Sequence, residues 1–425
     1  VRSRLRARDT ELSPEFSFFM EQEIYAQAAT AHAVITKYTG GSAMVRLVQP
    51  VIGPMQAERA RIMEALVRIS EITSDEQLGA LLDDLLRMPE CRRLTDAVRT
   101  PQLREFWQLP AGNEALASTF SSAEAAVFAD MLAACRDTDA RLAVRVLDAV
   151  VELQEIEETA QAAGRFADIV DGARARGNHV YVAACGSSYH AALAACLFFN
   201  DIAFTELIPI LPGEFRGHYA NTVRNDDVVI TVTQNSETKD LIDILDDIAA
   251  TGRRVQRIAI VNNVNSTIAI EKSDLVIPLR CGPEIAVPAT KSFINQITIF
   301  YTLALETAAH QIARNTGEWS QDLLEQRRRD LAQRREKLER IPELREQLFS
   351  LGNSQRTLRD AVLTQQCQCL LDRMSARLTQ ACELHRQVLR EGETALQLQQ
   401  ARLTTQRAQI EHLIDQHRSE RIDRW

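Results

Sequence analysis

The stretch Ala184-Cys-Gly-Ser-Ser-Tyr-His190 decides the fold of the central part of this chain. An apolar, β-rich run at 179–184 leads into it, and a helical run follows it. In an open parallel sheet, ligands lie beyond the carboxyl ends of the strands, where such turns occur. A glycine lets the backbone approach a ligand, and the helix N-terminus offers N–H groups and a partial positive charge. The stretch therefore predicts a strand-to-helix turn with room for an anion.

The same alternation continues outward from this turn. β-rich runs at 179–184, 204–210, 227–232, 255–261 and 274–279 alternate with helical runs, and a helix is expected from 290 to about 314. Strands that alternate with helices predict βαβ units and a parallel sheet. We therefore expect an α/β domain over 175–315, with a five-stranded parallel sheet, helices on both faces and flavodoxin-like layering.

The segments on either side of this domain have helical patterns. Residues 16–38 are amphipathic, and the glycine-containing segment 41–53 is expected to break that helix. Apolar residues at helical spacing over 54–174 indicate an all-helical insert. From about 320 the chain is polar and helical again, and an apolar stripe over 363–388 needs a partner face. The expected division is a lead-in (1–38), a helical insert (39–174), the α/β domain (175–315) and a helical tail (316–425).

The composition excludes several classes of protein. The chain has 425 residues, of which 45% are hydrophobic and 25% charged, as in globular proteins of two or three domains. A net charge of −9 argues against a nucleic-acid-binding surface. The longest apolar run, 191–199, is too short to span a bilayer, and no secretory signal is visible. Eight cysteines without a CxxC pair indicate a reducing cytoplasm, with neither a disulfide framework nor a metal site, and no cofactor is expected.

A second polar turn, Thr233-Gln-Asn-Ser-Glu-Thr238, follows the run at 227–232. Five of its six side chains are neutral hydrogen-bonding groups, which suit an anionic ligand with several hydroxyls. Both turns also have a structural interpretation. Ser187 or Ser188 can cap the first helix, and Glu237 can be the acid of a capping box in the second. Two such turns in one sheet favour a ligand site.

A third segment, Gly282-Pro-Glu-Ile-Ala-Val-Pro-Ala-Thr-Lys291, leaves the last predicted strand and enters a helix at Thr290. Glu284 is either a polar ligand of the site or a structural cap. Lys291 contacts either a phosphate or a neighbouring carboxylate. Spacing alone decides neither question.

These three segments, in this order, resemble the sugar isomerase (SIS) domain, and most of all the first such domain of isomerising glutamine–fructose-6-phosphate aminotransferases. The family's turns read Ala-Cys-Gly-Thr-Ser-Tyr, Ser-Gln-Ser-Gly-Glu-Thr and Gly-Pro-Glu-Ile-x-Val-x-Ser-Thr-Lys. Glu214-Phe-Arg216 resembles the family's segment between the first two turns. Phe19-Met-Glu-Gln-Glu-Ile-Tyr-Ala-Gln27 resembles Phe-Met-x-Lys-Glu-Ile-Tyr-Glu-Gln, with which the family's isomerase half opens.

The resemblance implies that the chain binds a sugar phosphate in the glutamine-dependent conversion of fructose 6-phosphate to glucosamine 6-phosphate, a step of amino sugar biosynthesis. The phosphate would lie mainly on the second turn. The candidate binding residues are Ser187, Ser188, Thr233, Gln234, Asn235, Ser236, Thr238, Glu284, Val287 and Lys291. Asn235 and Ser236 stand where the family has a serine and a glycine, and Ala289 replaces a serine that would donate to the sugar. By analogy with the family, a homodimer is also an option.

The resemblance covers about 16–27 and 178–307. The family's glutaminase domain and second sugar isomerase domain have no counterpart in this sequence, which has no lysine after Lys337, so no catalytic residue is assigned. We therefore expect a piece of a longer aminotransferase. Two alternatives stay open. One is a non-catalytic phosphosugar sensor or scaffold whose helices bind a partner, and the other is a stand-alone sugar-phosphate isomerase.

Overall fold

The computed structural model describes residues 11–14, 16–70, 81, 84–104, 138–234, 238–315 and 319–356. Residues 1–345 form one compact unit, which contains the sheet and the helices that cover it, and residues 346–425 form another. Of the second unit, the structure describes only the end of helix α15 (Gln321–Arg356). The stripe predicted over 363–388 lies outside the described residues.

Five strands form one parallel sheet in the order β2-β1-β3-β4-β5. The strands are β1 (Val180–Ala184), β2 (Ile208–Ile210), β3 (Val228–Thr233), β4 (Gln256–Val261) and β5 (Leu275–Pro278). This order confirms the predicted flavodoxin-like α/β fold. The chain winds outward from β1 to β2 and then returns to the other side of β1, so the topological switch point lies between β1 and β3. Ala184 pairs with Val232 there, which places the two polar turns side by side.

The second predicted strand is shorter than the expected run at 204–210. Helix α10 (Gly186–Ala203) ends at Phe204, whose φ of 47° is left-handed and incompatible with a strand. The buried Thr205 hydroxyl donates to the Ala203 carbonyl oxygen at 2.9 Å and closes the helix end. Extended pairing therefore begins only at Ile208.

Helices cover both faces of the sheet because successive side chains of each strand point to opposite sides. Val180, Val182 and Ala184 belong to one core, which includes residues of five helices. These are α1 (Phe19–Tyr38), α9 (Thr138–Arg176), α10, α14 (Lys291–Ala313) and α15. Tyr181 and Ala183 belong to the opposite core. Its helices are α11 (Pro212–His218), α12 (Lys239–Ala250) and α13 (Thr267–Glu271). The domain therefore has three layers, with the sheet between two layers of helices. The central strands β1 and β3 are fully buried.

The helical region before the sheet has a hydrophobic core of its own. This core combines the N-terminal part of α9 with α2 (Ala43–Ile52), α3 (Gln56–Ser70), α5 (Pro89–Ala97) and η2 (Pro101–Leu103). The chain breaks after α1 as expected, but residues 43–52 then form a helix that the sequence pattern did not assign. Ser42 starts it, because its hydroxyl accepts from the Val45 N–H at 3.2 Å and its own N–H donates to Glu152 at 2.6 Å.

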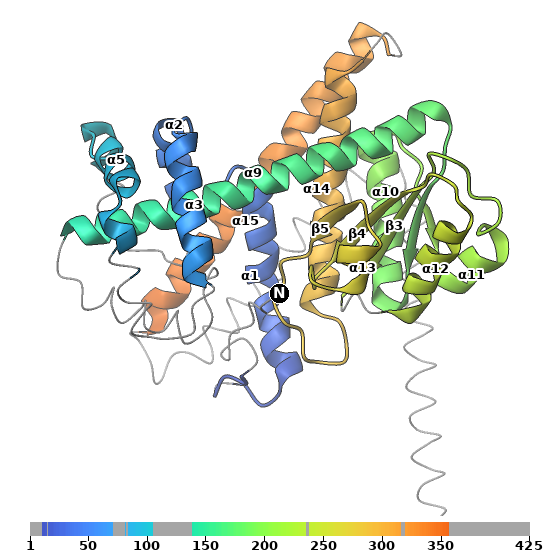
Figure 1. Ribbon diagram of the computed structural model, residues 1–425, viewed down its shortest axis with the longest axis horizontal. Helices are drawn as coiled ribbons and strands as arrows, with labels where there is room; N and C mark the ends of the chain where they lie inside the picture. The colour runs from blue at the N-terminus through green and yellow to red at the C-terminus, as the bar shows by residue number, and fades with distance from the viewer. Residues whose placement is uncertain are drawn as a thin grey trace, which may run out of the picture. The chain divides into compact units, whose positions relative to one another are not determined.

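Helix α9 joins the two cores, and Figure 1 shows it running from the helical region to the sheet. Its residues Leu142 to Leu153 lie in the helical core, whereas Ala163 to Ala173 lie in the core of the sheet. The last turns of the predicted helical insert therefore help to cover the sheet. None of the described helices combines the length and the apolar character needed to cross a membrane.

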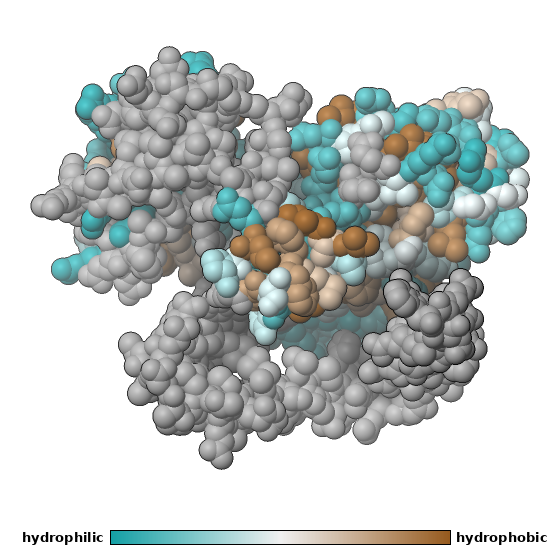
Figure 2. Space-filling view, turned by 90° about the horizontal axis from the view of Figure 1, so that it is seen from below, coloured by the Kyte–Doolittle hydropathy of each residue, from teal (hydrophilic) through white to brown (hydrophobic). Residues whose placement is uncertain are grey.

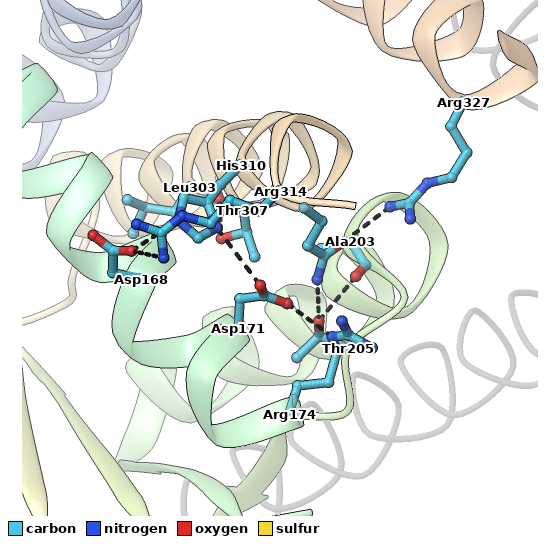
Figure 3. A network of polar contacts seen from close by, with 11 residues as sticks. Asp168, Asp171, Arg174, Ala203, Thr205, Leu303, Thr307, His310, Arg314 and Arg327 are labelled. Atoms are coloured by element: carbon cyan, nitrogen blue, oxygen red, sulfur yellow. Dashed lines mark hydrogen bonds and ion pairs between the residues drawn. The ribbon is translucent and has the colours of Figure 1, made fainter. Parts of the chain in front are cut away.

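A polar network ties the helices on this face to one another. Figure 3 shows Asp168 of α9 facing His310 of α14 and Arg314, the C-cap residue of that helix. The Asp168 carboxylate lies 2.8 Å from His310 Nε2 and 2.7 Å from Arg314 Nη1. Arg327 of α15 is buried between the rings of Phe204 and Trp319 and donates to the Ile202 carbonyl oxygen at 3.2 Å. Cation–π contact and hydrogen bonding together offset part of the cost of burying this guanidinium. The start of α15 is thereby fixed to the end of α10.

Candidate functional site at the carboxyl edge of the sheet

The first turn brings two serines to the end of β1. Gly186 begins α10 with a φ of 57°, a left-handed conformation that glycine adopts without strain. Cys185 occupies the N-cap position and makes no side-chain cap hydrogen bond. Neither serine therefore occupies the N-cap position. Ser187 is half-buried, and Ser188 is buried.

The second turn places two threonine hydroxyls together at the end of β3. The Oγ1 atoms of Thr233 and Thr238 are 2.9 Å apart. Thr238 is the N-cap residue of α12, and its side chain makes no cap hydrogen bond to that helix. The amide of Gln234 donates to the Glu284 carbonyl oxygen at 3.5 Å, which links this turn to the third segment. Asn235, Ser236 and Glu237 lie outside the described residues, so their roles remain predictions.

The third segment uses its charged side chains to hold its own backbone. The Glu284 carboxylate accepts from the Thr290 N–H at 2.8 Å and the Ser292 N–H at 3.1 Å, and also from both hydroxyls of these residues. It thereby caps α14. The buried Lys291 ammonium donates to the Pro283 carbonyl oxygen at 2.6 Å. The structure therefore gives both residues a structural contact, and a ligand contact for either stays a prediction.

Glu23 of α1 is a functional candidate that the analysis of the sequence missed. Its buried carboxylate accepts from the Ile285 N–H at 2.6 Å and the Ala286 N–H at 3.2 Å. These bonds join α1 to a loop 262 residues away in the sequence. Glu23 lies within the segment 19–27, whose resemblance to the start of an isomerase half was the available signal. The adjacent Val287 is fully exposed.

Apolar side chains surround these contacts on the outside. Figure 2 shows brown residues gathered on the face seen from below, where the start of α1 and the loop between β5 and α14 lie in Figure 1. The exposed apolar residues of these two segments are Phe18, Met20, Ile24, Tyr25, Ile285 and Val287. The loop thus directs side chains outward while Glu23 holds its N–H groups inward.

Cys185 lies in the first turn and Cys281 immediately precedes the third segment, and burial suppresses the reactivity of both thiols. Burial raises the pKa of the Cys185 thiol, and the nearby Asp240 raises it further. Burial, assisted by Glu284, raises the pKa of Cys281 to about 12. The thiolate is the nucleophilic form, so neither cysteine is activated near neutral pH. Within the described ranges, no group of three or more His, Cys, Asp or Glu side chains is placed to hold a metal ion.

The edge thus combines helix N-termini with hydroxyl and amide groups. The N-termini of α10 and α12 meet at the switch point. Neither N-cap residue, Cys185 or Thr238, makes a side-chain cap hydrogen bond to its helix. N–H groups at such ends bind anions, and hydroxyl and amide side chains bind the hydroxyls of a ligand. This arrangement can hold and orient an anionic, polyhydroxylated molecule.

Residues 175–306 match the sequence pattern of the SIS domain. This segment is a SIS domain. The chain is also 35% identical over 143 residues to the isomerising glutamine–fructose-6-phosphate aminotransferase of Pyrobaculum aerophilum, covering 33% of this chain and 23% of that protein. It is 33% identical over 165 residues to the same enzyme of Clostridium perfringens, covering 39% of this chain and 25% of that protein. The SIS domain and its surroundings therefore span about a quarter of the length of these relatives.

A solved structure is also similar to part of this chain. It is the C-terminal domain of glucosamine-fructose-6-phosphate aminotransferase from Francisella tularensis, with 20% sequence identity and a TM-score of 0.33. The match covers 48% of this chain and 56% of that one.

Proposed function

We propose that the SIS domain of this chain binds a phosphosugar, fructose 6-phosphate or glucosamine 6-phosphate, between the turns that follow β1 and β3. One observation carries the proposal. Two helix N-termini and the hydroxyls of Ser188, Thr233 and Thr238 gather at the switch point of the sheet. Ligands of open α/β sheets bind at such points.

The phosphate is assigned to the start of α12. Its partial positive charge favours an anion, and Lys239, the exposed first residue of the helix, adds a full positive charge. The Thr238 hydroxyl, beside Thr233, is placed to donate to a phosphate oxygen. By resemblance, Asn235 and Ser236 complete this cradle. The sugar hydroxyls then face the first turn, with Ser187 and Ser188, and the backbone near Val287.

The wider role we propose is the glutamine-dependent conversion of fructose 6-phosphate to glucosamine 6-phosphate within a longer protein. The support is the identity to the aminotransferases of Pyrobaculum aerophilum and Clostridium perfringens. Because the match spans about a quarter of those proteins, the complete reaction is assigned to a protein that contains this chain.

Titration calorimetry on the 425-residue chain tests the binding proposal. Fructose 6-phosphate and glucosamine 6-phosphate should bind, whereas fructose and glucosamine should bind at least about tenfold more weakly because they lack the charge-assisted phosphate contacts. Inorganic phosphate should compete weakly. Equal affinity for phosphorylated and unphosphorylated sugars contradicts the proposal, as does the absence of binding.

An activity assay tests the wider role. We expect the chain alone to make no glucosamine 6-phosphate from glutamine and fructose 6-phosphate, since no glutaminase nucleophile has been identified in it. Product formed with ammonia in place of glutamine would locate isomerase chemistry within these 425 residues. Glutamine-dependent product from this chain would contradict the expectation.

A further inference from the structure

Gln296 lies on α14 behind the first turn and is buried, with 1% of its surface exposed. Its Nε2 atom donates to the Ser188 hydroxyl oxygen at 2.9 Å. Its Oε1 atom is also buried and has no hydrogen-bond partner in the part of the chain that the structure describes. The contact with Ser188 is therefore what orients this amide.

The position of Gln296 is set by the contacts that fix the start of α14. Glu284 caps the helix, and the neighbouring Asn295 donates to the Leu279 carbonyl oxygen at 2.8 Å. Thr30 of α1 in turn donates to Asn295 at 3.1 Å. Gln296 thus approaches Ser188 from a helix that is held at several points.

The contact decides what the Ser188 hydroxyl can do. A serine hydroxyl has one hydrogen and two lone pairs. When one lone pair accepts from Gln296, the hydrogen points elsewhere and is available to a ligand at the first turn. A side chain that offered an oxygen instead of an N–H would attract that hydrogen and remove the donor from the site.

We propose that Gln296 is a positioning residue of the phosphosugar site, which acts by keeping the Ser188 hydroxyl a donor toward the ligand. The inference rests on the proposed function. It adds a specificity element from outside the three site segments, because Gln296 contributes through Ser188 and from the interior of α14.

A double-mutant cycle on the full chain tests this inference with fructose 6-phosphate as the probe. Gln296→Met keeps the volume and removes the donor, and it should weaken binding about tenfold, as should Ser188→Ala. The double variant should bind no more weakly than Ser188→Ala alone, because Gln296 acts through that hydroxyl. Losses that simply add would show that Gln296 does not act through Ser188 and would overturn the inference.

Gln296→Glu supplies a readout that a packing role would not change. The carboxylate should accept the Ser188 hydrogen at about pH 8, whereas the protonated acid, favoured by burial, can donate again at about pH 5. The dissociation constant of the variant divided by that of the wild type should therefore fall on acidification, and this ratio cancels the titration of the phosphate itself. A ratio independent of pH counts against the inference.

Gln311→Met is the matched control on the same helix. Gln311 is equally buried and bonds to Thr205 and Arg327, away from the first turn, so its loss should lower the unfolding temperature and leave the affinity unchanged. If the wild type does not bind fructose 6-phosphate, both the proposed function and this inference fall. If the wild type binds and Gln296→Met binds equally well, only this inference falls.

Discussion

The turns after β1 and β3 differ from the loop after β5 in how they use their polar side chains. In the two turns, hydroxyl and amide groups gather at the helix N-termini, and neither N-cap side chain caps its helix. In the loop, the carboxylates of Glu23 and Glu284 and the ammonium of Lys291 all bind backbone groups of the loop or of the start of α14. All three segments join a strand to a helix, yet they use these groups differently.

The cost of burying charge explains the difference. A buried carboxylate or ammonium must be paired with hydrogen-bonding partners, and the nearest ones are the N–H and C=O groups of an irregular loop. Burying a neutral hydroxyl costs less than burying a charge, so a hydroxyl need not be held by the backbone of a loop. In this protein, charged residues in a ligand-binding motif build the loop, and neutral residues are the better candidates for contact with the ligand.

Of the substitutions that test this comparison, Glu284→Ala should lower the free energy of unfolding most. It removes the acceptor of the Thr290 and Ser292 N–H groups, so α14 loses its cap and the donors lose their partner. We expect the free energy of unfolding to fall by about 2–4 kcal/mol, measured by urea denaturation. Glu214→Ala is the control, because this exposed acid at the start of α11 accepts from the Leu211 N–H of its own helix start, at 3.4 Å. If both variants lose equally little, Glu284 does not build the loop.

Glu23→Ala should have the next largest effect. The Ile285 and Ala286 N–H groups would lose a buried acceptor, and we expect a loss of about 1–3 kcal/mol in the free energy of unfolding. Glu23→Gln keeps an amide oxygen in place and should recover part of the loss. Limited proteolysis should detect cleavage near Val287 in the alanine variant first. Unchanged protection of this loop would argue that α1 does not hold it.

Thr238→Val tests the other side of the comparison. The substitution removes a hydroxyl at the start of α12 and should weaken phosphosugar binding by about 0.5–1.5 kcal/mol, with little change in stability. Calorimetry with fructose 6-phosphate measures the first quantity and thermal unfolding the second. Thr222→Val, at an exposed threonine that donates to the Tyr219 carbonyl oxygen, is the control and should bind normally. If Thr238→Val lowers stability but not affinity, Thr238 holds the backbone, as Glu284 does, and does not contact the ligand.

Substituting the two cysteines should have the smallest effect, a change in how stability depends on pH. The unfolded thiol has a pKa of about 8.5, and burial raises that of Cys281 to about 12. The stability from the protonated thiol is thus complete below about pH 8.5 and is lost as pH rises toward the folded pKa, by roughly 0.8 kcal/mol at pH 9. Cys281→Ala should flatten the decline in stability between pH 7 and pH 9, measured by denaturation. Cys185→Ala should flatten it less, because that thiol is only half-buried. Identical declines in both variants and the wild type would contradict the assigned burial effect.

The sequence predicted the sheet well because its strands are short apolar runs bounded by turns. β3 and β4 lie within a residue of their expected ends. The errors occur where a local pattern had two solutions. Residues 204–206 have strand composition, but the left-handed Phe204 ends α10 there. Residues 43–52 form a helix whose N-cap residue, Ser42, donates its N–H to Glu152, 110 residues away in the sequence.

By itself, the sequence determined the fold class, the order of the three polar segments and their place at the ends of strands, since periodicity and turn residues act locally. Only the tertiary structure decided which side chains those segments keep for themselves. Glu284 and Lys291 had two open interpretations, and the packing of the loop gave each a backbone partner. Glu23 and Gln296 reach the site from α1 and from the interior of α14, because these helices bury one face against the same sheet. Which buried groups meet depends on that shared packing, and no local pattern records it.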